Sequence, residues 1–280
     1  MPQITALSDF PKLNNSSDKS TLAAKLQLRP FGCAVEDLEI NFDINSPALV
    51  TNLIRLCTVT PNDTRPAEHF YWSLEVGKRI ECLIRIATSE HSPHIVTVLK
   101  CQKEGCGKYL ELRLSLDTLL SETYCNSDDD SCSLTVLGKN IRLRKPTGFD
   151  QLSWLSLNHA NQMEAVESII ATLLIHNAEL PDEIKSCSNE AIEQIGEGLS
   201  EIDPLIDYKI ELECPLCLTK ELYRLDLEKL LLKKLKEIQK DLLSEIHQLA
   251  SNYHWTENEI IAMPASRRSL YLSVIEGEKS

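Results

Sequence analysis

Two cysteine pairs, each set between strand-like segments, constrain this chain more than any other feature of its sequence. The first pair is Cys101 and Cys106 in CQKEGCG, and the second is Cys214 and Cys217 in CPLC, 108 residues after Cys106. Structural zinc sites commonly consist of four thiolates that two such short turns bring around one ion. We therefore predict that these four cysteines bind one structural zinc ion.

The residues around the cysteines favour tight metal-binding turns. Gly105 and Gly107 flank Cys106 and allow the backbone to turn sharply, so that amide N–H groups can point at the sulfur atoms, while Pro215 stiffens CPLC. Two alternatives remain, namely two metal-free thiol pairs and a redox-active CPLC dithiol. A redox dithiol of the thioredoxin kind would open a helix, whereas CPLC lies between two expected strands.

Alternating residues predict a β-hairpin around each cysteine pair. Residues 95–99 are rich in β-branched side chains, and residues 109–116 alternate between polar and leucine positions. Residues 208–213 and 221–227 repeat this pattern around CPLC, and similar sequences, LSLDTLL and LDLEKLL, follow the two units. The chain therefore contains a weak internal repeat of strand, cysteine pair, strand and acidic-apolar exit.

Helical periodicity covers much of the remaining chain. We expect helices over residues 46–57, 71–88, 163–176, 189–202, 227–251 and 266–276, with a strand over 134–144. The expected fold class is α+β, mostly helical, with two small zinc-ribbon-like hairpins clasped by the four-cysteine site and a long C-terminal helix. The expected organisation is a mostly flexible N-terminal tail (1–45), a helical and zinc-ribbon-like domain (46–226) and a C-terminal helical region packed on it (227–280).

Composition narrows the classes of function. Hydrophobic residues make up 42% of the 280 residues, which is enough for a packed core, and the net charge is −13. Such acidity repels phosphate backbones and argues against a zinc-ribbon nucleic-acid binder. The start of the chain lacks a basic and apolar leader pattern, and apolar runs are too short for a membrane span, so we expect a cytoplasmic protein without a membrane partner.

Several other motifs have a structural and a functional interpretation. The segment from Cys125 to Cys132 encloses three aspartates, which indicates a solvated loop or a second cation site. The other cysteines lie in or near apolar patterns and are expected to be small core residues, namely Cys33, Cys57, Cys82 and Cys187. In the loop 146–150, Thr147 or Asp150 is expected to cap the next helix or to contact a partner. The apolar stripe over 231–249 packs on its own core or docks a partner helix.

Near the C-terminus, residues 256–259 form a capping-box sequence preceded by Trp255. Trp255 either staples onto Ile260 or forms part of a docking surface. Tryptophan, tyrosine and arginine are enriched at binding hot spots. The candidate partner-binding residues are Trp255, Arg267, Arg268 and Tyr271.

The order of these motifs resembles a known family. Along the chain the motifs occur in this order: RIAT (85–88), the first cysteine turn, PTGFD (146–150), Asp203-Pro204 and CPLC. The ending consists of LASNYHWTENEII (249–261), followed by Met263-Pro264, Arg267-Arg268 and Tyr271-Leu272. Over residues 70–275 the chain resembles the T-even phage baseplate hub assembly chaperone family, in a zinc-bearing branch that accompanies extracellular contractile injection systems. The first turn is C-x4-C, where that branch has CPxCG.

The resemblance implies a non-catalytic assembly factor for the baseplate hub of a phage-tail-like contractile injection system in the bacterial cytoplasm. Its partners would be hub or spike proteins of the contractile tail. One alternative is a structural baseplate subunit that stays in the particle, and a second is a zinc- or thiol-dependent enzyme. Against catalysis, four thiolates leave zinc no open position, and no metalloprotease histidine motif or Gly-x-Ser-x-Gly occurs in the sequence.

Overall fold

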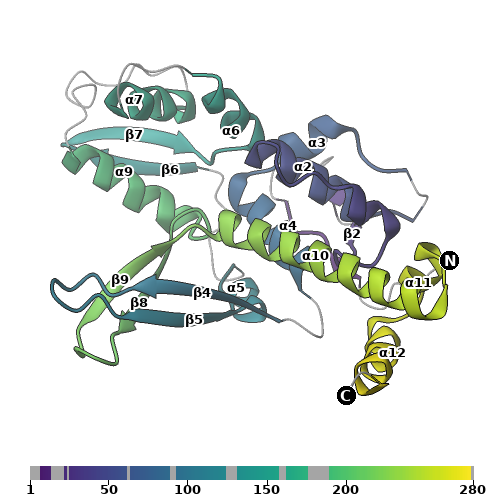
Figure 1. Ribbon diagram of the computed structural model, residues 1–280. Helices are drawn as coiled ribbons and strands as arrows, with labels where there is room; N and C mark the ends of the chain where they lie inside the picture. The colour runs from purple at the N-terminus through teal and green to yellow at the C-terminus, as the bar shows by residue number, and fades with distance from the viewer. Residues whose placement is uncertain are drawn as a thin grey trace.

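The long helix α10 (Leu227–Tyr253) starts near the middle of the molecule and runs to the end where α11 and α12 lie (Figure 1). A computed structural model describes residues 7–13, 22–23, 25–61, 64–88, 93–123, 131–157, 162–175 and 189–278. Apolar side chains of α10 pack into two separate hydrophobic clusters of the chain. Its predicted stripe is buried or partly buried in them, at Leu231, Leu235, Ile238, Leu242, Ile246 and Leu249.

The main core lies where helices α2 (Ser46–Cys57), α4 (Val76–Ala87) and the first half of α10 pack together. The Asn45 side chain caps α2 by accepting a hydrogen bond from the Ala48 amide at 3.0 Å. The helix predicted over 71–88 is instead interrupted between α3 (Glu68–Trp72) and α4. The cause is tertiary, because Glu75 forms a β-bridge with Thr147 that pulls the backbone out of helical geometry.

Part of the predicted flexible tail belongs to the main core. Strands β1 (Ser8–Asp9), β2 (Gln27–Leu28) and β3 (Thr58–Val59) form a small antiparallel sheet. Phe10, Leu26, Leu28 and Phe31 are buried in the core cluster, which ties these stretches down. The short helix η1 (Val35–Glu39) follows, and Asp37 within it forms a buried ion pair with Arg29 at 2.7 Å. Residues 1–6, 14–21 and 24 lie outside the described residues.

A second cluster forms an inserted subdomain between the two cysteine hairpins in the sequence. Strands β6 (Ser131–Val136) and β7 (Lys139–Arg144) pack against helices α7 (Gln162–Leu173) and α9 (Asn189–Ile202). The single strand predicted over 134–144 is wrong, because Leu137 and Gly138 both take positive φ and fold it into a hairpin. Helix α6 (Gly148–Leu155) connects this subdomain to the main core. A cap by Thr147 or Asp150 was one of the two expectations for this loop, and the two residues together form a capping box.

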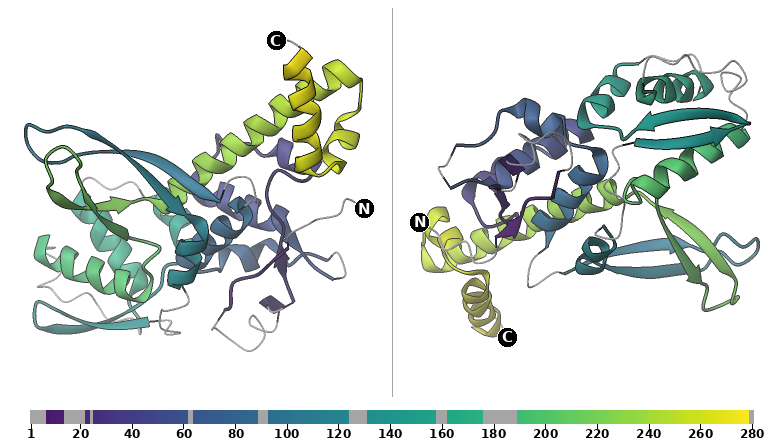
Figure 2. Two further views of the ribbon diagram at one scale, coloured as in Figure 1. Left: turned by 90° about the horizontal axis from the view of Figure 1, so that it is seen from below. Right: turned by 180° about the vertical axis from the view of Figure 1, so that it is seen from behind.

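The two predicted cysteine hairpins are confirmed. The first pairs β4 (His94–Lys100) with β5 (Tyr109–Ser115), and the second pairs β8 (Tyr208–Glu213) with β9 (Lys220–Leu225), both antiparallel. The first leads directly into α5 (Leu116–Thr123) and the second, after Asp226, into α10. The two hairpins lie side by side in all views (Figures 1 and 2). The fold is thus mixed helix and strand, with small antiparallel sheets and a long helix near the C-terminus.

The C-terminal end forms a third cluster at the far end of α10. Helices α11 (Glu257–Ala262) and α12 (Ala265–Glu278) fold back against it, and both lie at the opposite end of the molecule from the hairpin tips (Figure 2). The predicted capping box is confirmed, since the Thr256 hydroxyl accepts from the Glu259 amide and the Glu259 carboxylate accepts from the Thr256 amide.

Candidate metal centre

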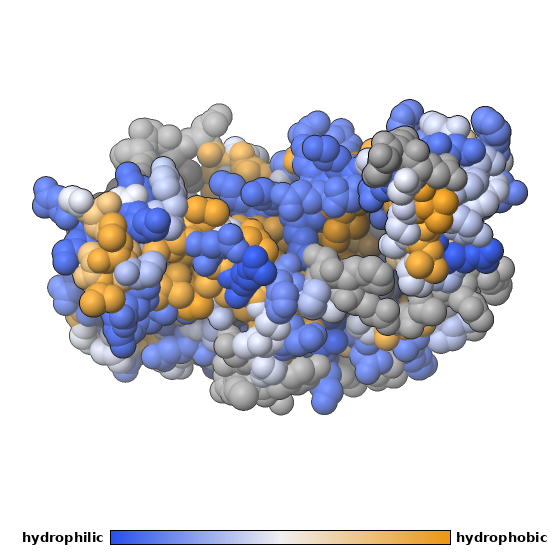
Figure 3. Space-filling view, turned by 60° about the horizontal axis from the view of Figure 1, so that its bottom comes forward, coloured by the Kyte–Doolittle hydropathy of each residue, from blue (hydrophilic) through white to orange (hydrophobic). Residues whose placement is uncertain are grey.

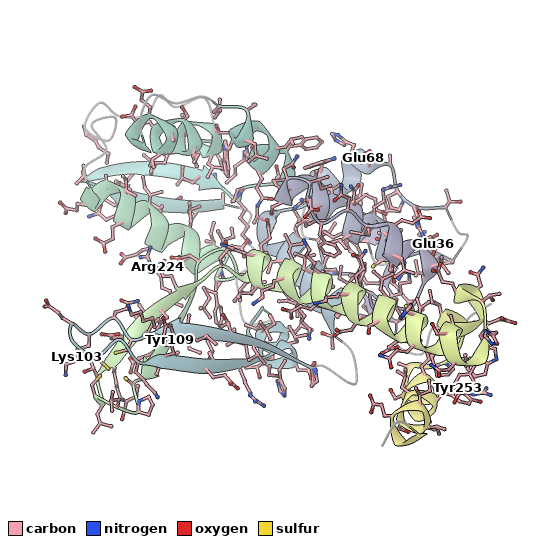
Figure 4. All side chains as sticks on the ribbon, viewed as in Figure 1. Glu36, Glu68, Lys103, Tyr109, Arg224 and Tyr253 are labelled. Atoms are coloured by element: carbon pink, nitrogen blue, oxygen red, sulfur yellow. The ribbon has the colours of Figure 1, made fainter. Side chains whose placement is uncertain are left out.

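Each hairpin presents its two cysteines in the turn that joins its strands. Lys100 pairs with Tyr109 as the last pair of the first ladder, and Glu213 pairs with Lys220 as the last pair of the second. Beyond these pairs the backbone leaves the ladder and forms the two turns. Figure 4 shows Lys103 at the tip of the first hairpin, next to the sulfur atoms.

Backbone hydrogen bonds close both turns. In the first, the Cys101 amide donates to the Lys108 carbonyl at 2.8 Å and the Cys106 amide to the Lys103 carbonyl at 3.1 Å. Gly105 and Gly107 have φ of +79° and +58°, which explains why glycine stands on both sides of Cys106.

The second turn is built differently. The Cys214 amide donates to the Thr219 carbonyl at 3.0 Å, and the Leu218 amide donates to the Cys214 carbonyl at 2.8 Å. Leu218 takes φ of +57°, a left-handed conformation that is uncommon for a non-glycine residue.

The four sulfur atoms converge to the size of a metal site. All four Sγ atoms lie within 4.8 Å of one another, and the closest cross-turn pairs are Cys101–Cys217 at 3.7 Å and Cys106–Cys214 at 3.8 Å. These separations far exceed the S–S length of a disulfide, about 2.05 Å. A tetrahedron with metal–sulfur bonds of about 2.3 Å has edges of about 3.8 Å. The four residues therefore fit a single metal ion, with ligands from both turns.

The protein environment shifts the pKa values of Cys101 and Cys217 in opposite directions. Burial raises the pKa of Cys101 to about 12, while a hydrogen bond from the Lys103 amide acts in the opposite direction. Hydrogen bonds from the hydroxyl and the amide of Thr219 lower the pKa of Cys217 to about 6. Metals bind thiolates, so Cys217 is more ready than Cys101 to act as a ligand, and metal binding at Cys101 releases its proton.

A carboxylate that the sequence reasoning missed joins the two turns. Glu221 Oε2 accepts hydrogen bonds from the Gln102 amide at 2.8 Å and the Tyr223 hydroxyl at 3.1 Å, and it lies 4.0 Å from Cys101 Sγ. Glu221 thus connects β9 of the second hairpin to the turn of the first. The sequence gives only a weak indication of this role. Glu221 and Tyr223 are two residues apart on a strand, which places both side chains on one face.

The predicted partner-binding residues lie around α12 but do not share one surface. Trp255 and Tyr271 form an aromatic cluster with Tyr253, with ring centroids 4.6 Å apart for Tyr253 and Trp255 and 4.8 Å for Trp255 and Tyr271. Arg267 is exposed and lies over the Tyr271 ring. Arg268 faces inward instead, where its guanidinium pairs with Glu245 at 2.8 Å and donates to the Met263 carbonyl.

The remaining cysteines lie away from this centre where they are described. Cys57 and Cys82 are buried in the main core and Cys132 in the second cluster, as expected of small core residues. Cys33 is half-buried and its thiol donates to the Pro30 carbonyl. The predicted loop 125–132 falls mostly outside the described residues, as does Cys187.

Comparisons with known proteins add no family to this picture. No protein-family model, curated protein or solved structure matches the chain. Among the helices that the structure describes, none combines the length and apolar character needed to cross a membrane.

Proposed function

We propose that the four cysteines hold one structural Zn²⁺ ion, which clasps the two hairpins together in a zinc-ribbon-like unit. The support is the near-tetrahedral spacing of four thiols from two turns 108 residues apart. Zinc favours such an all-thiolate set, and four thiolates complete its coordination. The ion therefore supplies structure, with no position left for a substrate or a reactive water.

Elemental analysis of the purified full-length chain tests the metal. We expect about one zinc per chain in protein produced with ample zinc. Iron in place of zinc would show that the site is a rubredoxin-like iron centre, because four thiolates suit both metals. A protein that folds normally without any metal contradicts the clasp.

The hairpins expose apolar side chains, and this is the observation on which a binding function rests. Val96 and Val98 are exposed on β4, Leu216 and Leu218 on the second turn, and Leu222 on β9. Figure 3 shows apolar patches separated by polar surface, one of them toward the hairpin end of the molecule. Apolar side chains exposed in groups mark sites of protein–protein contact, and a metal clasp holds them in place before binding.

From this surface and the family resemblance of residues 70–275, we propose a non-catalytic assembly factor for the baseplate hub of a contractile injection system. The exposed apolar residues Val96 and Val98 of β4 and Leu216 and Leu218 of the second turn (the hairpin face) would cover an apolar or strand-edge surface of a hub or spike component until that component enters the growing ring. The acidic charge of −13 would limit nonspecific self-association of the loaded factor. The proposed setting is the bacterial cytoplasm, where such particles are built.

Mass spectrometry of purified particles separates this role from that of a retained baseplate subunit. An assembly factor is required for particle formation but absent from finished particles. Stoichiometric presence of the chain in those particles would contradict the chaperone role and favour the role of a structural baseplate subunit.

A pull-down with the zinc-loaded chain tests the hairpin face. We expect Val98→Glu and Leu216→Glu to lose most of the captured hub component, because each places a charge in the apolar contact. Leu155→Glu, at another exposed leucine on α6, is the matched control and should capture normally. Equal capture by all variants would show that the client binds elsewhere.

A further inference from the structure

The first cysteine turn is the longer of the two and contains a glycine between its cysteines. Four residues separate Cys101 from Cys106, whereas two separate Cys214 from Cys217. No atom of the described residues lies within 4 Å of the position that a Cβ at Gly105 would take, so this part of the turn packs against no other element there. Glycine loses more conformational freedom on folding than any other residue. The first turn therefore gains more than CPLC from a contact outside itself.

Such a contact begins at the backbone amide of Gln102, directly after the first cysteine. The Cys101 amide still donates to the Lys108 carbonyl of its own hairpin. The Gln102 amide instead donates to Glu221 Oε2 on β9 of the other hairpin, at 2.8 Å. A hydrogen bond to a carboxylate is about twice as strong as one between neutral groups. The first turn is thus tied to the second hairpin by a protein group as well as by the proximity of the thiols.

Tyr223 holds the Glu221 carboxylate in place. Its ring is 4% exposed and lies in the small cluster between the hairpins, with Cys101 and Cys214. Its hydroxyl donates to the same oxygen, Oε2, at 3.1 Å. A buried tyrosine hydroxyl usually has a hydrogen-bond partner, so the pair supports both side chains. The contacts run in one line from the buried ring through the carboxylate to the backbone of the first turn.

The negative charge of Glu221 is no help to a metal-binding thiolate. Oε2 lies 4.0 Å from Cys101 Sγ, and two negative charges at that distance repel each other. If Glu221 acted through its charge, it would weaken metal binding. Any favourable effect on the site must therefore come from its hydrogen bonds.

We propose that Glu221 is a positioning residue, which docks the first cysteine turn on the second hairpin without an ion and thereby raises the affinity of the four-thiol site for zinc. Groups behind the ligands commonly orient them, and a preformed site has less freedom to lose when it binds. The effect on affinity rests on the zinc site proposed above, whereas the docking does not.

Competition with a zinc-binding dye on the full-length chain tests the effect on affinity. Glu221→Ala should bind zinc about 10–100-fold more weakly. Glu221→Gln should stay close to the wild type, because its single amide oxygen can accept both hydrogen bonds that Oε2 accepts. Glu211→Ala is the matched control, since it removes a 63% exposed carboxylate from the neighbouring strand β8 and should not change the affinity. Equal weakening in the Ala and Gln variants of Glu221, or none in either, overturns the proposal.

A double variant separates the turn from the tyrosine. Glu221→Ala leaves the buried Tyr223 hydroxyl without this acceptor, which by itself destabilises the cluster. Glu221→Ala/Tyr223→Phe removes the hydroxyl too, and we expect it to bind zinc at least as weakly as Glu221→Ala. Wild-type affinity in the double variant would show that the unpaired hydroxyl caused the loss, which contradicts the positioning role.

Hydrogen exchange of the zinc-free full-length chain, followed by NMR, tests the docking alone. The Gln102 amide should be protected in the wild type and exchange about tenfold faster or more in Glu221→Ala, because a hydrogen bond to a charged group is lost. Equal exchange of this amide in the two proteins overturns the docking. A wild-type chain that binds no zinc but keeps this protection overturns the zinc site and the effect on affinity, while the docking stands.

Discussion

The two hairpin units of this molecule have similar cysteine turns but are followed by helices of different length. Both place two cysteines in a turn between antiparallel strands, and both continue into a helix that packs on the main core. The first helix, α5, is 8 residues long and contributes Leu116 and Leu119 to that core. The second, α10, has 27 residues and reaches a further cluster at the other end of the molecule.

The two turns reach one geometry by different chemical means. The first has four residues between its cysteines and uses two glycines with positive φ, while the second has two and holds Leu218 in the left-handed region. Both turns nevertheless deliver two thiols to one cluster, in which the ligand atoms lie within 4.8 Å of one another. The proposed shared ion would therefore constrain the positions of the sulfur atoms more than the sequence of either turn.

Loss of one cysteine ligand from either unit is expected to have the largest effect on zinc content and on stability. Cys101→Ser and Cys214→Ser should each reduce bound zinc from about one ion per chain to near zero, because three thiolates of a shared site bind far more weakly. The unfolding free energy should fall by on the order of 5 kcal/mol. This loss is smaller than the ~10 kcal/mol that zinc binding contributes in small zinc fingers, because this chain also has hydrophobic clusters that hold the fold without the ion. Metal analysis and urea titration measure both quantities.

Cys132→Ser is the control for these two variants, since Cys132 is buried in the second cluster. It should keep its zinc. If Cys101→Ser retained a full complement of zinc while Cys214→Ser lost it, the two units would not share an ion.

The second prediction compares the two helices. Leu116→Ala in α5 and Leu231→Ala in α10 remove fully buried leucines from the same core, so each should cost about 2–5 kcal/mol. An 8-residue helix depends on tertiary packing, whereas a 27-residue helix also has another cluster to support it. Hydrogen exchange should show local loss of protection over α5 in Leu116→Ala, and retained protection over residues 242–250 in Leu231→Ala.

Leu243→Ala provides the baseline for this pair, because Leu243 is exposed on α10 and should change stability by less than about 0.5 kcal/mol. Equal loss of protection along α5 and along the whole of α10 would mean that the two units unfold as one.

The third prediction concerns Asp203, which ends the insertion between the units. Its buried carboxylate accepts a hydrogen bond from the Gly77 amide at 3.1 Å at the start of α4, and burial raises its pKa to about 6. The unfolded chain, with an aspartate pKa near 3.8, releases this proton first. The contribution of Asp203 to stability is therefore greatest below pH 4 and decreases as pH rises to about 6, by up to about 3 kcal/mol.

Asp203→Asn keeps an acceptor for Gly77 without the titration. Relative to the variant, the wild type should lose stability between pH 4 and pH 6 in urea titrations. A constant difference across this range would show that Asp203 titrates normally in the folded protein.

The smallest expected effect distinguishes the two turns themselves. Gly107→Ala should cost about 1 kcal/mol, because alanine is strained at φ of +58°. Leu218→Gly should be nearly neutral, since relief of strain at φ of +57° offsets the added entropy of the unfolded chain and the side chain is 69% exposed. Thermal unfolding of the zinc-loaded variants compares them, and equal destabilisation by both would mean that Leu218 makes a contact that matters.

Much of the local structure was predictable because local signals and tertiary packing agree. The helices over 46–57 and 189–202, both cysteine hairpins, the helix cap at Thr147 and the capping box at Thr256 occur where periodicity and cap residues placed them. The failures share a cause. The break between α3 and α4 comes from pairing of Glu75 with Thr147, and the packed stretches of the predicted tail are held by core contacts rather than by their own propensity.

The sequence by itself determined which four residues form the candidate metal centre, because cysteine spacing and flanking strands are local properties of the chain. Only the tertiary structure decided that the two pairs meet, since a separation of 108 residues leaves their distance open until the core packs. It likewise decided that Glu221 joins the two turns and that Arg268 turns inward while Leu270 stays exposed. Such facts depend on which surfaces remain after packing, and no local pattern encodes them.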